Sequence, residues 1–181
     1  MEIPLSLVRL DASGRKPAAG AEAAALRYGI PLWYRLVSCS IAGILVAANA
    51  LASLEPGYRL SAFGIVLVLA AVLAAVYEER WTFRAADRSV AGKLGLVFAA
   101  KRLRFSFEDV ARVKVDSFIK GRLDQSAVPP ADKVPRGSLA RMIIEMKDGQ
   151  GYLVDSVPFK ARERLEDAAA AIAAMVGVPL D

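Results

Sequence analysis

Two long apolar runs dominate the first half of the chain, at residues 36–54 and 60–77. At about 1.5 Å of rise per residue, each run would form a helix about 27 to 29 Å long, close to the roughly 30 Å hydrocarbon core of a bilayer. A short segment containing Pro56 and Gly57 separates them, and this pair is typical of a tight turn. The pattern predicts a transmembrane helical hairpin over residues 31–77.

From residue 78 onward, apolar and polar positions alternate. Phe105 and Phe107 alternate with Arg and Ser side chains, and Val113 and Val115 alternate with charged ones. Strict alternation is typical of antiparallel strands that bury one face and leave the other in water. Similar patterns predict further strands at residues 81–83, 89–98, 142–146 and 152–157.

The last third of the chain contains a turn signal and then a helical period. The Asp-Gly pair at 148–149 is a strong signal for a β-hairpin. Apolar residues recur at three- and four-residue spacing over 165–176, which predicts an amphipathic helix with one buried stripe. Gly177 suits its C-cap and Pro179 prevents its continuation. The expected fold class is α+β, with about six or seven antiparallel strands closed by one helix.

The residues before the hairpin, 1–30, are predicted to be a cytoplasmic arm and linker. Residues 1–12 alternate weakly and are read either as a short strand or as an ordered arm. The Gly, Pro and Ser residues of 13–20 indicate a flexible linker. The Ala-rich run at 21–28 favours helix by propensity, either as a lead-in to the first span or as a helix on the membrane surface.

Aromatic residues mark the ends of the two apolar runs. Trp33 and Tyr34, together with Arg35, precede the first run, and Tyr77 and Trp81 follow the second. Aromatic rings favour the headgroup level of a bilayer, and an Arg side chain can extend its guanidinium to the same level. We interpret these five residues as membrane-interface anchors on one side of the membrane.

The basic residues predict the orientation. Several Lys and Arg residues precede the first apolar run and follow the second, whereas the connecting segment carries Arg59 alone. The positive-inside rule then places both termini in the cytoplasm. Because the first run follows about 30 residues that include acidic ones, and not a short basic start, we expect no cleaved signal peptide.

Asn49 is the one strongly polar side chain well inside an apolar run. Intramembrane polar residues often form hydrogen bonds between helices. Asn49 is therefore a candidate helix–helix contact, with the partner helix or with a neighbouring copy. It could equally lie near the far interface, because the turn follows within a few residues.

Composition excludes several kinds of site. The 181 residues include no His and one Cys, Cys39, in the first apolar run. A disulfide within one chain is therefore impossible, and the usual zinc ligands and the commonest general base are missing. Adjacent acids such as Glu108 and Asp109 diverge in direction in either a strand or a helix. We expect a protein that is not an enzyme, with no catalytic, cofactor or metal site.

Basic side chains suggest a binding surface. Arg102, Arg104, Arg112 and Lys114 are expected to project from neighbouring strands. Cytoplasmic leaflets are anionic, and each Lys or Arg near that surface contributes about 1 kcal/mol of attraction. These four residues are candidate lipid contacts, and the alternative is a solvated sheet face. The net charge of +5 also permits nucleic-acid binding, but no corresponding motif is present, so we expect no nucleic-acid partner.

The order of elements, with certain residues, resembles the bacterial pleckstrin-homology-like (PH-like) domains. The residues that carry the resemblance lie at 81–83, 105–113, 148–149 and 172–180. The whole chain is similar to the group in which a two-helix membrane hairpin precedes such a domain, here 78–181. The resemblance implies a strongly bent, partly open sheet, a location in the bacterial inner (plasma) membrane, and a role as an adaptor or scaffold.

Residues 118–138 depart from this resemblance. They contain several Pro and Gly residues and are longer than an ordinary connection. The segment is either a mobile insertion or a binding loop that a partner orders.

The resemblance and the basic residues together lead us to expect one of two functions. The first is a membrane-anchored adaptor that binds another protein or copies of itself, and the second is an anionic-lipid-sensing module that uses the basic sheet face.

Overall fold

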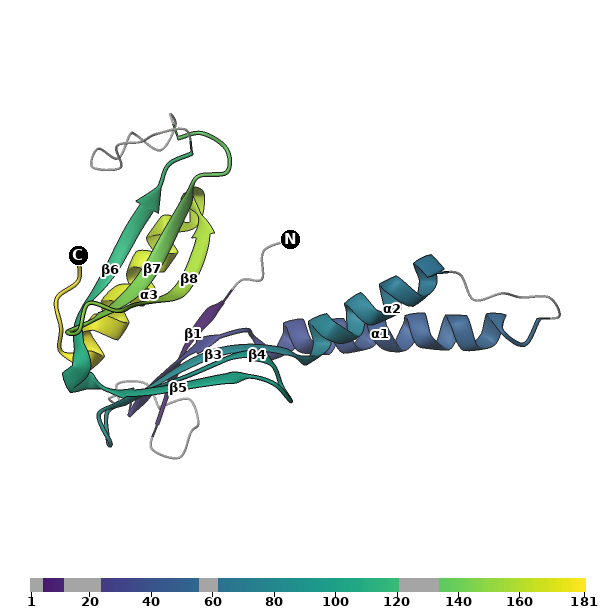
Figure 1. Cartoon of the computed structure of the whole chain (residues 1–181), viewed down its shortest axis with the longest axis horizontal. Coiled ribbons are helices and arrows are strands. Elements are labelled where there is room, and N and C mark those ends of the chain that lie inside the picture. The colour runs from purple at the N-terminus through teal and green to yellow at the C-terminus, as the bar shows by residue number, and fades with distance from the viewer. Residues whose placement is uncertain (1–4, 12–23, 56–61, 121–133) are drawn as a thin grey trace.

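The structure is a computed structural model of the chain, and it describes residues 5–11, 24–55, 62–120 and 134–181. Its elements, in order, are β1 (Ser6–Leu10), β2 (Ala25–Gly29), α1 (Leu32–Ala52), α2 (Ala62–Val76), β3 (Tyr77–Arg84), β4 (Ser89–Leu96), β5 (Lys101–Ser106), β6 (Val110–Phe118), β7 (Leu139–Met146), β8 (Gly151–Pro158) and α3 (Arg162–Val176) (Figure 1).

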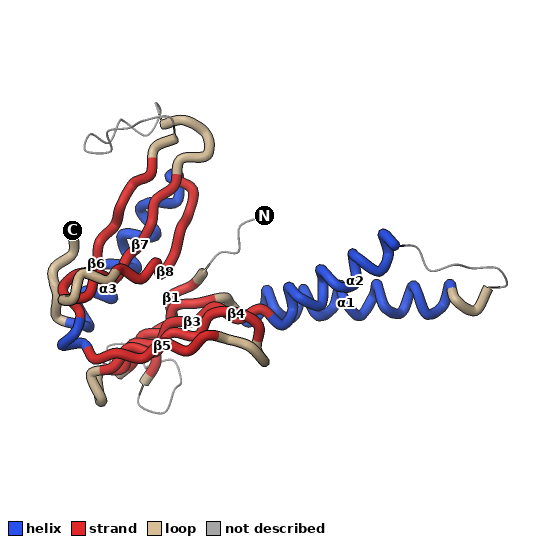
Figure 2. Tube along the Cα trace, viewed as in Figure 1, coloured by secondary structure: helices blue, strands red, loops and turns tan. Residues whose placement is uncertain are grey.

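The strands form two antiparallel sheets. Sheet A has five strands in the order β1-β2-β3-β4-β5, and sheet B has three in the order β6-β7-β8. Helix α3 packs on sheet B, and α1 and α2 project together from one end of sheet A (Figure 2). The predicted α+β class is confirmed, but the strands number eight in the described chain, where about six or seven were expected.

The additional strands lie before the helices. β1 pairs with β2, and β2 pairs with β3, so the N-terminal residues belong to sheet A. The helix predicted at residues 21–28 is therefore wrong where the structure describes it. Strand pairing lets Leu26 and Tyr28 reach the core, where they are 3% and 2% exposed, and this burial overrides a weak helix propensity. The linker predicted at 13–20 lies outside the described residues.

Helices α1 and α2 are inserted between two neighbouring strands of sheet A. β2 leads into α1, α2 leads directly into β3, and Gly29 pairs with Arg80 between those strands. Among the described helices, α1 is the one long and apolar enough to cross a membrane by length and composition. α2 is apolar but has 15 described residues. The predicted turn at Pro56 and Gly57 lies outside the described residues.

The core lies between the inner face of sheet A, sheet B and α3. The 165–176 helix predicted from three- and four-residue spacing is confirmed, and its apolar stripe is buried. Gly177 caps it in the left-handed conformation, with φ of 80°. The largest fully buried side chains are Trp81, Phe83, Ile119, Met142, Ile144, Leu165 and Ile172.

Two connections explain how the chain passes between elements. The hairpin predicted at 148–149 joins β7 to β8, with Gly149 at a φ of +86°. Phe107, expected in a strand, begins a short 3-10 helix at the corner between the sheets. Ser106 and Asp109 form a reciprocal capping box there, which ends β5. Residues 118–138 depart from the PH-like resemblance, and 121–133 of them lie outside the described residues.

Candidate functional site

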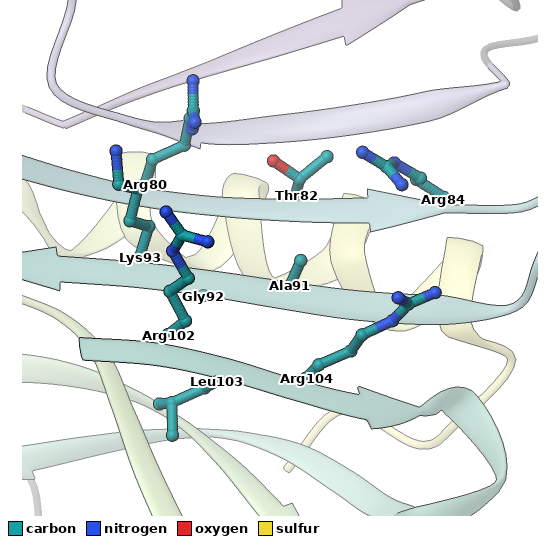
Figure 3. Close-up of a pocket in the computed structure, with 9 residues that line it drawn as sticks. All are labelled: Arg80, Thr82, Arg84, Ala91, Gly92, Lys93, Arg102, Leu103 and Arg104. Carbon is teal, nitrogen blue, oxygen red and sulfur yellow. The ribbon is translucent and has the colours of Figure 1, made fainter. Parts of the chain in front are cut away.

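A groove of about 330 Å³ on the outer face of sheet A is lined largely by cations (Figure 3). Strands β3, β4 and β5 each contribute three lining residues. We call this site the basic groove, and its lining residues are Arg80, Thr82, Arg84, Ala91, Gly92, Lys93, Arg102, Leu103 and Arg104.

The strand register brings these cations together. Arg80 pairs with Lys93, and Lys93 pairs with Arg102, so the three side chains form one row across the sheet. Directly paired residues of antiparallel strands point to the same face. The next row contains Ala91, and its small side chain leaves the floor of the groove low. Arg104 closes that row on β5.

Two acidic residues neutralise only part of this charge. Glu78 is 3.3 Å from Arg80 and 2.5 Å from Lys93 in nitrogen–oxygen distance. At the other end, Asp87 makes longer contacts with Arg84 (3.9 Å) and Arg104 (3.7 Å). Arg102, in contrast, forms no ion pair with any acidic side chain that the structure describes. The groove therefore has a positive excess that suits an anion.

Positive charge also accumulates where sheet A meets the helices. Burial lowers the pKa of Arg27, and the positive charges of Arg80 and Arg35 lower it further. Burial acts to raise the pKa of Glu78, but the hydrogen bond from Lys93 and the charges of Arg80 and Arg35 lower it overall. Glu78 thus stays ionised among four cations, and an added anion would be attracted to the same place.

The four basic residues predicted to share a face do not do so. Arg102 and Arg104 lie in the basic groove on β5, whereas Arg112 and Lys114 lie on β6 in sheet B. The prediction of one face from neighbouring strands is therefore wrong. β5 and β6 are consecutive but unpaired, because the corner at 107–109 carries the chain from one sheet to the other.

Arg112 has a structural role on sheet B. Its guanidinium forms ion pairs with Glu145 on β7 and with Asp181. The hydrogen bonds that the guanidinium donates to both carboxylates raise the pKa of Arg112 above its ordinary value. Val113 donates its N–H to the Pro179 carbonyl, so the segment around Asp181 lies along β6. These contacts hold the end of the described chain against the sheet.

Sequence reasoning missed three basic members of the groove, Arg80, Arg84 and Lys93. The available signal was the alternation of Arg80 and Arg84 with the core residues Trp81 and Phe83, which places both arginines on the outer face. Their neighbours on β4 and β5 depend on the register between strands, which alternation alone does not determine.

Four of the five predicted interface anchors lie at the ends of the two apolar helices, and the fifth lies in the core. Trp33 and Tyr34 lie in the first turn of α1 with ring centroids 6.0 Å apart, and Trp33 is 56% exposed. Arg35 follows them, and Tyr77 is half-buried as the first residue of β3. Trp81 is only 1% exposed and packs in the core, so its prediction as a membrane anchor is wrong. Its place on the inward face of β3 keeps it away from any headgroup.

Asn49 lies on the side of α1 that faces α2. Its side-chain N–H donates to the Leu45 carbonyl at 2.8 Å. The residue also lines an apolar cavity of about 260 Å³ together with Gly64 and Val68 of α2. This placement puts its amide between the two helices.

Neither the metal-ligating side chains nor comparisons with known proteins point to a specific chemistry. Within residues 5–11, 24–55, 62–120 and 134–181, no group of three or more His, Cys, Asp or Glu side chains could hold a metal ion. No protein-family model and no curated protein sequence matches the chain. The function is therefore argued from the basic groove and its surroundings.

Proposed function

We propose that the chain is a non-enzymatic, membrane-anchored protein of the PH-like kind that binds anionic lipid headgroups in the basic groove. The observation that carries this proposal is the position of one row of cations. Arg80, Lys93 and Arg102 lie in one row across sheet A, and Arg80 is the fourth residue of β3, the strand into which α2 leads.

The connections support a hairpin that crosses the membrane twice. α1 starts next to β2 and α2 ends at β3, and these two strands are paired. If α1 crosses a bilayer, the chain must return to reach β3, and α2 is the helix that leads back to it. Both sheets then lie on one side, which the positive-inside rule makes the cytoplasmic side of the bacterial inner membrane.

The distance from α2 favours contact with headgroups. Arg80 lies four residues beyond Val76 along the strand, which is about 13 Å at roughly 3.3 Å per residue. The polar layer of a bilayer is roughly 5 to 8 Å thick on each side, and long Arg side chains reach back toward it. Guanidinium groups bind phosphate with paired hydrogen bonds. The row nearest the helices is therefore placed to bind lipid phosphate.

The test measures thermal stabilisation of the full-length protein in mild detergent by short-chain phosphatidylglycerol. Phosphatidylcholine and inorganic phosphate serve as the other two ligands. We expect phosphatidylglycerol to stabilise most, since it offers both the phosphate and the membrane-like surface. Stabilisation by inorganic phosphate alone would indicate a soluble anion as the ligand. Equal effects of both lipids would contradict the proposal.

Matched variants locate the effect. Arg102→Gln with Arg104→Gln should weaken the apparent affinity for phosphatidylglycerol about fivefold per charge, equal to about 1 kcal/mol each. Lys114→Gln with Lys147→Gln removes the same charge from sheet B and its β7–β8 turn and should leave the affinity nearly unchanged. Equal losses in both double variants would show that net charge, and not the basic groove, controls binding.

Protein binding as an adaptor is a second candidate. A groove of about 400 Å³ lies between the edge strand β1 and α3, with apolar lining residues such as Leu7 and Ala168 beside Arg9 and Asp167. A partner segment or a second copy could occupy it. A photo-crosslinking residue at position 7 should then capture a specific protein or a dimer in cells, whereas one at Ala86 should not. Equal labelling at both positions would contradict this role.

A further inference from the structure

The turn between β4 and β5 carries an exposed apolar tip made of Val97, Phe98 and Ala99. Phe98 is 77% exposed and Val97 is 42% exposed. Among the described residues of 5–30 and 77–181, Phe98 is the most exposed large apolar side chain. Turn tips are ordinarily polar, because their side chains face water. Such an apolar tip is therefore suited to contact with an apolar surface.

The tip lies beside the end of α2. The Val97 N–H donates to the carbonyl of Val76, the last residue of α2, at 2.9 Å. β4 runs antiparallel to β3, so it returns toward the end of the sheet from which the helices leave. The turn is seen there, at the base of the helices (Figures 1 and 2).

The turn has a defined conformation. Gly95 adopts a φ of +120°, which favours glycine, and Ala99 donates its N–H to the Leu96 carbonyl at 2.8 Å. Lys93 and Lys101 flank the tip on the two strands. In an anionic membrane surface the phosphate layer covers the hydrocarbon. The apolar tip matches the hydrocarbon, and the flanking lysines match the phosphate layer.

We propose that the β4–β5 tip inserts into the membrane interface, where lipid covers Phe98 and Val97. The inference rests on the membrane anchoring in the proposed function. The two helix connections emerge from β2 and β3, whereas the tip lies at the β4–β5 side of the sheet. A further contact, displaced along the sheet edge from the two helix connections, would restrict the tilt of the domain against the membrane. Together with the helix connections, this contact would hold the row of Arg80, Lys93 and Arg102 at the headgroups.

Site-directed spin labelling of the full-length protein in phosphatidylcholine–phosphatidylglycerol vesicles tests this proposal. Cys39→Ser removes the native thiol. Single labels are then placed at Phe98→Cys, at Ala86→Cys, and at Ile41→Cys. Position 86 is an exposed turn at the opposite end of sheet A, and position 41 lies on the exposed side of α1. The measured quantity is the accessibility of each label to oxygen relative to a water-soluble nickel complex.

We expect the ratio of oxygen to nickel accessibility at position 98 to be well above that at 86 and to approach that at 41. A ratio at 98 equal to that at 86, with a high ratio at 41, would overturn the insertion of the tip while leaving the anchor intact. A low ratio at all three positions would overturn both the insertion and the membrane anchor on which it rests.

Discussion

The Tyr28 hydroxyl donates a hydrogen bond to the carboxylate of Asp155, which joins β2 of sheet A to β8 of sheet B. The two residues are 127 positions apart, and both are buried. Burial raises the pKa of Tyr28, and the hydrogen bond to Asp155 raises it further, so the phenol stays protonated as the donor. This contact ties the strand that leads into the first apolar helix to the sheet that carries α3.

Tyr28→Phe should lower the free energy of unfolding by about 1.5 to 3 kcal/mol, because it removes a hydrogen bond to a buried charged group. Tyr152→Phe is the matched control, since its hydroxyl donates to the exposed Gln150 side chain. The control should change stability by less than about 0.5 kcal/mol. Denaturant unfolding of both variants measures the difference, and equal losses would argue against the bond between the sheets.

Gly92→Ala should destabilise the domain by about 1 to 3 kcal/mol through overpacking. A Cβ at this position would lie 2.9 Å from a ring carbon of Trp81, which is itself held in the core. At Gly151 the nearest atom to an added Cβ is 3.4 Å away, on Ile143, so Gly151→Ala is the control. If both variants unfold at the same denaturant concentration, Trp81 does not pack against Gly92.

Glu79 should make stability depend on pH. Burial raises the pKa of Glu79 above its ordinary value of 4.5, and the charge of Asp155 raises it further. The folded state therefore holds this proton more tightly than the unfolded state, and stability falls as pH rises from 4.5 through the folded pKa. Glu79→Gln should be more stable than the native protein at about pH 7 and similar to it at about pH 4.

Thermal unfolding at several pH values measures this effect. Glu163→Gln, on the exposed start of α3, should follow the native pH profile and serves as the control. A Glu79→Gln variant that is less stable than the native protein at neutral pH would show that the ionised carboxylate is stabilising.

Arg112→Gln should release the segment around Asp181 from sheet B without changing the binding of phosphatidylglycerol. The substitution removes the ion pairs to Glu145 and Asp181. Hydrogen exchange at the amides of Val113 and Val115 should become faster, because both donate to carbonyls of that segment. Stabilisation by phosphatidylglycerol should stay as in the native protein. A matching loss of lipid response would place the headgroup site on sheet B and contradict its assignment to the basic groove.

Elements with a local burial pattern could be predicted from the amino-acid sequence alone. The 3.6-residue period over 165–176 predicted α3, and the Asp-Gly pair at 148–149 predicted the β7–β8 hairpin. Alternation predicted the strands around Phe83, Val113 and Ile144, because each of these strands buries one face. Continuous apolar runs predicted the two apolar helices, since such a run needs no distant partner to be recognised, but they did not predict that the helices are inserted between β2 and β3.

Which elements become neighbours depends on contacts between residues that are far apart in the sequence. The segment at 21–28 has helix propensity, yet it joins the sheet because pairing with β3 buries Tyr28. The position of Trp81 just after an apolar run predicted a membrane anchor, but its side chain lies on the inward face of β3 and packs in the core. The basic groove unites Arg80 with Lys93 and Arg102 through register. Register depends on contacts across the whole sheet, so the side chains of one strand could not reveal it.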